Sequence, residues 1–125
     1  MEWYLKVMRD NYANFNGRAR RKEYWMFTLF FMLFLLASIF VFGALIGILG
    51  DNTGTTLGGI IVAALYFGHL VPALAVTVRR LHDTGKSGWM YLLVIIPYIG
   101  SLIIFIFTVM QGDRGDNKYG PDPKA

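Results

Sequence analysis

Residues 24–50 read YWMFTLFFMLFLLASIFVFGALIGILG and contain no charged side chain. Two further stretches, residues 52–78 and 87–112, are also free of Lys, Arg, Asp and Glu. A helix rises about 1.5 Å per residue, so about 20 apolar residues cross the roughly 30 Å hydrocarbon core of a bilayer. Each stretch is long enough to do so. We therefore expect an all-α membrane protein with three transmembrane helices, over residues 25–50, 57–78 and 88–110.

The composition supports a membrane protein and a single membrane domain over residues 1–125. Charged residues make up 16% of the chain, whereas a soluble domain has about 25%. A soluble fold would have to bury all three apolar stretches, with too little chain left to cover them. Cysteine is absent, which excludes disulfides and cysteine-based metal sites. The first stretch is too long for a signal-peptide core and lacks a small-residue cleavage pattern, so we expect it to remain as an anchor.

The N-terminal segment, residues 1–24, is polar and basic. Its larger apolar side chains recur at helical spacing with charges between them, which predicts a short amphipathic helix lying in the membrane interface. Asn16-Gly17 would end this helix as a turn. The alternative is a frayed terminus. The side chains that form the pattern are Trp3, Tyr4, Val7, Met8, Tyr12 and Phe15.

A basic cluster stands directly before the first apolar stretch and next to Tyr24-Trp25. Cations beside interfacial aromatic residues mark a cytoplasmic membrane boundary. We expect these cations, together with Lys86, to lie near anionic lipid headgroups, or only to set the topology. The cluster consists of Arg18, Arg20, Arg21 and Lys22.

The distribution of basic residues also predicts an orientation. The N-terminal segment holds six Lys and Arg residues, the link at residues 51–56 none, the link at residues 79–87 three, and the polar tail at residues 111–125 three. The positive-inside rule then favours a cytoplasmic N-terminus and, with three spans, an external C-terminus. The alternative is that the third stretch is a re-entrant hairpin turning at Pro97, which returns the tail to the cytoplasm.

Small residues four apart in the apolar stretches predict close helix packing. In the first stretch Gly43 and Gly47 form a G-x-x-x-G pair, which lets two helix backbones approach. The second stretch holds two such pairs, so we expect its helix to be the most enclosed. These pairs are Gly59 with Ala63 and Ala64 with Gly68.

The densest polar sequence is RRLHDTGKSGW at residues 79–89. It is not a phosphate-binding P-loop, because Arg80 stands where the first glycine belongs and no strand precedes it. A structural role would pair Asp83 with an arginine and use Ser87 as a helix cap. We expect Asp83 and Glu23 to lie within salt-bridge reach of Arg18, Arg21, Arg79 or Arg80. A functional role would bind lipid phosphate or a partner. The candidate residues are Arg79, Arg80, His82, Asp83, Lys86 and Trp89.

His69 lies near the centre of the second stretch, where an ionisable side chain is a candidate functional site. Pro72 lacks an N–H and frees the carbonyl of Gly68. A neutral His69 could bond to a freed carbonyl or to a tyrosine such as Tyr66 or Tyr98. One histidine is too few for a metal site, and the acids of the tail lack the spacing of a calcium loop. We expect no cofactor.

Three motifs together resemble the bacterial inner-membrane family known as domain of unknown function 805. They are FNGRARRKEYW (residues 15–25), RRLHDTGKSGW (residues 79–89, followed by Pro97 and Gly100) and NKYGPDP (residues 117–123). The resemblance implies a small inner-membrane protein of bacteria. It carries over no catalytic residue, since the family has no established activity.

The sequence predicts a non-enzymatic inner-membrane protein with a structural or regulatory role or a role as a partner subunit. Its basic cytoplasmic face would hold anionic lipid, with a homo-oligomer or a membrane-protein partner left open and no nucleic-acid partner. The alternative is a small transporter or channel subunit that uses oligomer contacts and His69. A third reading is an enzyme acting on lipid through His82 and Asp83.

Overall fold

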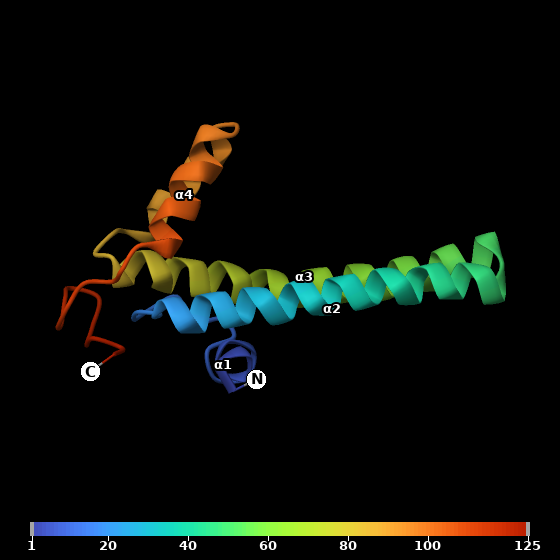
Figure 1. The fold of residues 1–125 in the computed structure, drawn as a ribbon, viewed down its shortest axis with the longest axis horizontal. Coiled ribbons are helices and arrows are strands. Elements are labelled where there is room, and N and C mark those ends of the chain that lie inside the picture. Colours follow the sequence, from blue (N-terminus) through green and yellow to red (C-terminus); the bar gives the residue numbers. More distant parts are fainter. Residues whose placement is uncertain (1, 125) are drawn as a thin grey trace.

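A computed structural model describes residues 2–124, except for the side chain of Val94. In this part of the chain the structure is helical, and the only strand-like feature is an isolated bridge between Asn117 and Gly120. Two long antiparallel helices form the body, and a shorter helical hairpin diverges from one end of them (Figure 1). The elements are α1 (Glu2–Leu5), η1 (Lys6–Asp10), α2 (Arg21–Leu49), α3 (Asp51–Asp83), η2 (Gly88–Ile95) and α4 (Ile99–Val109).

Both long helices can cross a membrane by their length and composition. At about 1.5 Å per residue, α2 and α3 reach roughly 43 and 50 Å, which exceeds a hydrocarbon core of about 30 Å. A single residue, Gly50, joins them with a φ of 88° that suits glycine. The polar link expected at residues 51–56 is therefore wrong, because these residues form the first turns of α3.

Two glycines of α3 set the close packing of α2 against α3. A Cβ on Gly54 would collide with the backbone at Ile46, and a Cβ on Gly58 would collide with Phe42. In contrast, Gly43 and Gly47 have open space beside them. Within this chain Gly43 and Gly47 therefore do not pack against α3, because the one-residue link fixes a register that turns the other G-x-x-x-G pair, Gly54 and Gly58, toward α2.

The N-terminal segment folds back onto the α2–α3 pair. Regular helix ends at Asp10, after one α-helical turn and a π-helical turn, so the helix is shorter than the pattern through Phe15 predicts. The Tyr4 ring stacks on Phe27 at 5.9 Å between centroids and meets Phe34 edge-on at 5.3 Å. The segment is therefore docked by aromatic packing and does not fray.

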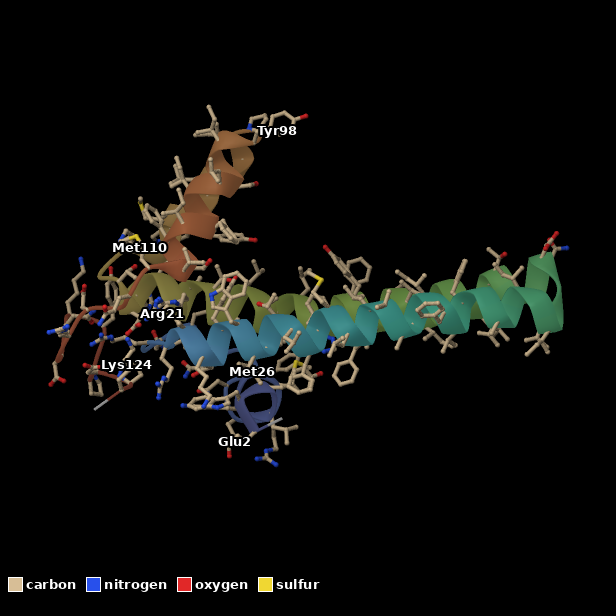
Figure 2. The ribbon with its side chains drawn as sticks, viewed as in Figure 1. Glu2, Arg21, Met26, Tyr98, Met110 and Lys124 are labelled. Carbon is tan, nitrogen blue, oxygen red and sulfur yellow. The ribbon has the colours of Figure 1, made fainter. Side chains whose placement is uncertain are left out.

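The third apolar stretch is broken in its middle. A 3₁₀-helical segment, η2, ends at Ile95, and α4 begins at Ile99 after a reversal at Pro97-Tyr98, where Tyr98 has a φ of 62°. Gly100 lies so close to the Leu93 carbonyl that no side chain fits between η2 and α4. Tyr98 is 90% exposed at the tip of this hairpin (Figure 2). The prediction of one continuous helix over residues 88–110 is therefore wrong.

The C-terminal tail returns to the end of the molecule where α2 begins and α3 ends (Figure 1). The Asp113 N–H donates to the Asp83 carbonyl oxygen at 2.6 Å, and Gly112 leaves no room for a side chain beside the Asp83 carboxylate. The N-terminal segment and the tail thus lie on the same side of the α2–α3 pair. The three-span arrangement predicts opposite ends for them, whereas here the η2–α4 hairpin reverses the chain and brings the tail back.

Candidate functional site

A buried charge cluster lies where α2 begins, α3 ends and the tail folds over both. At its centre the two carboxylate oxygens of Asp83 bind different arginines, Arg18 at 2.9 Å and Arg80 at 2.6 Å. The side chains of all three residues are at most 1% exposed. Charges at this depth are stable only when they are paired and hydrogen-bonded. The cluster comprises Arg18, Glu23, Arg79, Arg80 and Asp83, and Lys6, whose side chain is 46% exposed, lies at its edge.

Glu23 forms the second centre of the charge cluster. Its carboxylate pairs with Arg79 through one oxygen and lies 3.6 Å from the Lys6 ammonium through the other. Arg79 also donates to the Asn14 carbonyl oxygen at 3.0 Å. These bonds join the N-terminal segment to the ends of α2 and α3.

The two arginines bound to Asp83 also hold backbone carbonyls from distant segments. Arg18 donates to the carbonyls of Asp113 and Gly115, each at 2.6 Å. Arg80 donates to the Thr108 carbonyl at 3.0 Å and to the Met110 carbonyl. Carbonyls at the C-terminus of a helix such as α4 lack partners within the helix, so a buried guanidinium satisfies them. The charge cluster therefore ties the end of α4 and the tail to α3.

The expectation that Asp83 and Glu23 lie within salt-bridge reach of arginines is confirmed. Arg21 is not part of these pairs and donates instead to the Val109 carbonyl at 3.3 Å. Because the side chains of Arg18, Arg79, Arg80 and Asp83 are buried, they face protein groups rather than a headgroup layer. Among the cations named from the sequence, those with exposed or half-exposed side chains are Arg20, Arg21, Lys22 and Lys86.

An exposed basic cluster surrounds the Trp3 ring. The Lys6 ammonium, the Arg20 guanidinium and the Lys22 ammonium lie 5.3, 5.5 and 5.4 Å from the ring centroid. The Nε of Arg20 is buried without a hydrogen-bond partner. We call Trp3, Lys6, Arg20 and Lys22 the tryptophan cluster. It brings three cations to one aromatic side chain at the N-terminus of α2.

The motif at residues 79–89 divides into buried and exposed parts. Ser87 caps η2, since its hydroxyl accepts from the Trp89 N–H at 3.3 Å, as predicted. Lys86 lies over the Phe107 ring at 4.6 Å, and Trp89 is 77% exposed. His82 is buried, donates from Nδ1 to the Gly17 carbonyl at 2.9 Å, and stacks on Tyr119 with 4.0 Å between ring centroids. Since the Asp83 carboxylate binds arginines, His82 and Asp83 do not form an acid–base pair with each other.

His69 is fully hydrogen-bonded. The Leu65 carbonyl oxygen lies 2.8 Å from Nδ1, which must be the donor because a carbonyl only accepts. Nε2 then accepts from the Tyr4 hydroxyl at 2.6 Å. Burial raises the pKa of the Tyr4 phenol, which keeps it protonated as a donor. The Gly68 carbonyl that Pro72 frees accepts from the Tyr12 hydroxyl at 2.7 Å. His69 thus bonds to a tyrosine as expected, but this tyrosine is Tyr4 and not Tyr66 or Tyr98.

The tail forms an ordered loop of its own. The Asp122 carboxylate accepts from the backbone N–H groups of Lys124 and Gly115, each at 2.9 Å, and these bonds hold the pKa of Asp122 below its usual value. Asn117 donates to the His82 carbonyl at 2.9 Å. No group of three potential metal-ligating residues occurs within the residues that the structure describes.

Comparison with known proteins agrees with the resemblance in the sequence. The family model described as "Protein of unknown function (DUF805)" matches residues 12–121. The chain belongs to this family. It is 48% identical over 130 residues to the inner membrane protein YhaH of Escherichia coli (strain K12), which covers 99% of this chain and 98% of that protein.

Two further relatives come from the same organism. The inner membrane protein YhaI is 43% identical over 125 residues, which covers 99% of this chain and 97% of YhaI. The uncharacterized protein YiiR is 29% identical, with 87% of this chain and 85% of YiiR covered. No solved structure matches the chain.

Sequence reasoning missed several residues that complete the site in this DUF805 chain. Trp3, Tyr4 and Tyr12 belong to the recognised aromatic pattern, but their spacing does not reveal that they contact α2 and α3. Tyr119 and Asn117 lie in the motif NKYGPDP, and nothing local indicates that they reach His82. Both NKYGPDP and residues 79–89 are motifs of the same family. Their occurrence together is the one sequence signal that could have indicated a contact between them.

Proposed function

We propose that the protein is a non-enzymatic protein of the bacterial inner membrane whose cytoplasmic face binds anionic lipid headgroups. The names of the relatives YhaH and YhaI support the inner membrane. The observation that carries the lipid-binding proposal is the tryptophan cluster, which gathers three cations around one interfacial aromatic ring.

The proposed topology has two spans, α2 and α3, with both termini in the cytoplasm. The η2–α4 hairpin would enter the inner leaflet as a re-entrant element and not cross it. Supporting this, all twelve Lys and Arg residues lie in the N-terminal segment, the end of α3 with its following loop, and the tail. None lies near the α2–α3 link at Gly50. This distribution follows the positive-inside rule more fully than three spans would.

The chemistry of the tryptophan cluster suits a phosphate group. Arg20 precedes α2, and Lys22 lies in its first turn, where the positive end of the helix dipole disfavours cations by about 0.3–1 kcal/mol each. An anion would relieve this repulsion and could also bind free N–H groups of the helix N-terminus. Indole rings favour headgroup depth, so the anion would be a lipid phosphate.

Two sets of contacts favour lipid binding over the two alternative functions, an enzyme that uses His82 and Asp83 and a transporter that uses His69. Both oxygens of the Asp83 carboxylate are held in buried ion pairs with arginines, which stabilise the carboxylate in its charged form and disfavour a role as a proton donor. His69 is bonded through both ring nitrogens and stacks on Phe31 at 4.6 Å. Its ring therefore supports the docking of the N-terminal segment rather than an ion pathway.

Native mass spectrometry of the purified protein tests the proposal. The wild-type protein is expected to retain phosphatidylglycerol or cardiolipin in preference to phosphatidylethanolamine. The double variant Arg20→Gln/Lys22→Gln is expected to lose most of this retained anionic lipid, because each basic residue near an anionic surface contributes about 1 kcal/mol of attraction.

The matched control is Arg114→Gln/Lys124→Gln, which removes the same charge from the tail. It should retain anionic lipid like the wild type if the tryptophan cluster is the binding site. Equal loss of retained anionic lipid in both double variants would mean that binding depends on net charge alone and not on the tryptophan cluster. Unchanged retention in Arg20→Gln/Lys22→Gln, with topology preserved, would leave these cations as an orientation signal only and refute the proposal.

A further inference from the structure

A groove of about 580 Å³ runs along the outer face of α3 beside η2. Its floor is a stripe at helical spacing, Leu74, Val78 and His82, which extends about 12 Å along the axis at about 1.5 Å per residue. One wall comes from Trp89, Tyr91 and Leu92 of η2, and Phe15 and Tyr119 lie at the other side. This volume is within the range of about 300–1,000 Å³ for small-molecule sites.

The groove is polar at one end only. Its Leu74 end belongs to the apolar part of α3, and its His82 end adjoins the buried charge cluster. Besides His82, the polar side chains of the lining are Ser87 at the start of η2 and the hydroxyl-bearing rings of Tyr91 and Tyr119, and the rest of the lining is aromatic and aliphatic. An occupant must therefore be an apolar chain with one small polar end.

The His82 ring has one hydrogen-bonding atom left for such a polar end. Nδ1 donates to the Gly17 carbonyl, and one face of the ring stacks on the Tyr119 ring. Nε2 has no hydrogen-bond partner in the described part of the chain. The residue as a whole is only 9% exposed. Burial disfavours the charged form of the imidazole, and thus a second proton on the ring. Nε2 is then a hydrogen-bond acceptor.

We propose that this groove binds an uncharged, hydroxyl-bearing acyl lipid, with the chain between α3 and η2 and the hydroxyl donating to His82 Nε2. The proposal rests on the membrane placement proposed above but not on the tryptophan cluster. An acyl chain matches the apolar lining, and a hydroxyl matches a lone acceptor. A carboxylate or phosphate matches Nε2 less well, because an ionised oxygen has no proton to donate to this lone pair.

A photoreactive monoacylglycerol with a diazirine near the end of its chain provides a direct test. The wild-type protein would be reconstituted in phosphatidylcholine nanodiscs, irradiated and mapped by mass spectrometry. We expect adducts on the peptide that contains Trp89 and Leu92. Unlabelled monoacylglycerol should compete better than its analogue with O-methylated hydroxyls, by about three- to tenfold, the range for one net hydrogen bond.

Two variants separate the groove from its acceptor. Val78→Phe fills the floor and should abolish the adducts, whereas Val71→Phe, on an exposed face of the same helix, should leave them unchanged. His82→Phe keeps the ring and should bind both competitors equally. If His82→Phe fails to fold, the Val78→Phe and Val71→Phe pair still decides whether the groove is occupied.

The outcomes that overturn the proposal are distinct from those that overturn anionic-lipid binding. Adducts spread evenly over the exposed faces of α2 and α3 would show bulk lipid only. Equal competition by the O-methylated analogue in the wild-type protein would remove the role of Nε2. Stronger competition by a fatty acid or lysophosphatidic acid would assign the groove to an anion instead.

Discussion

Tyr12 donates its hydroxyl to the Gly68 carbonyl, 56 residues further along the chain, at 2.7 Å. This carbonyl is the one that Pro72 leaves without a helical N–H partner. The N-terminal segment thus repairs a defect in the long helix α3, and the repair provides a contact that can be measured.

A double-mutant cycle isolates this contact. Tyr12→Phe should destabilise the protein by about 1 kcal/mol, the net value of a typical hydrogen bond. In a Pro72→Ala background the new N–H can bond to the Gly68 carbonyl, so Tyr12→Phe should cost less. Thermal unfolding of the four proteins in detergent gives the coupling, for which about 0.5 kcal/mol or more is expected. Additive effects would mean that Tyr12 does not serve the freed carbonyl.

Asp83→Asn should be among the most damaging conservative changes. It leaves Arg18 and Arg80 buried against a neutral amide, and breaking a buried ion pair costs about 3–5 kcal/mol. The control is Asp10→Asn, whose partner Arg9 is 71% exposed, and which should change stability by less than about 1 kcal/mol. Melting temperatures of the two variants in the same detergent provide the comparison, and similar melting temperatures would argue against the charge cluster as the support of this end.

The glycine register predicts opposite results for two identical substitutions. Gly58→Ala should lower the melting temperature, because its Cβ meets Phe42 of α2. Gly43→Ala has open space beside it and removes a residue about 0.8–1 kcal/mol less favourable than alanine in a helix. It should leave the melting temperature unchanged or raise it. A loss of stability in Gly43→Ala alone would indicate a different α2–α3 register.

The absence of cysteine makes topology directly measurable. Single variants Lys124→Cys and Asn52→Cys introduce one thiol each at opposite ends of the α2–α3 pair. An impermeant maleimide added to intact cells should label Asn52→Cys, while Lys124→Cys should react only after the inner membrane is permeabilised. Labelling of Lys124→Cys in intact cells would restore the arrangement with three spans.

The sequence predicted the parts of the fold that depend on local pattern. Apolar stretches without charge identified α2 and α3, and the few acids beside many arginines identified Glu23 and Asp83 as ion-pair partners. The hairpin turning at Pro97 is the alternative reading of the third stretch, and 23 apolar residues fit one span better than two spanning arms, which need about 40 residues. Length alone cannot distinguish one helix from a hairpin of two half-length segments.

Contacts that depend on register or on backbone carbonyls were beyond sequence reasoning. Both Gly43-Gly47 and Gly54-Gly58 have the spacing for close packing, and only the one-residue link at Gly50 decides between them. Arg18 looked like a headgroup ligand because a basic cluster beside tyrosine and tryptophan is typical of an interface. Its partners are instead the carboxylate of Asp83 and backbone carbonyls of a glycine-rich tail. Every residue type has a backbone carbonyl, so the sequence does not indicate which ones bind Arg18.

The partners of Arg18 also impose an order on biosynthesis. Arg18 is synthesised 95 residues before Asp113 and 97 residues before Gly115, whose carbonyls it binds. Both long helices, α2 and α3, therefore leave the ribosome while this guanidinium still lacks two of its ligands. The polar end of the protein can close only after the tail has emerged, which makes its maturation a late event that follows membrane insertion.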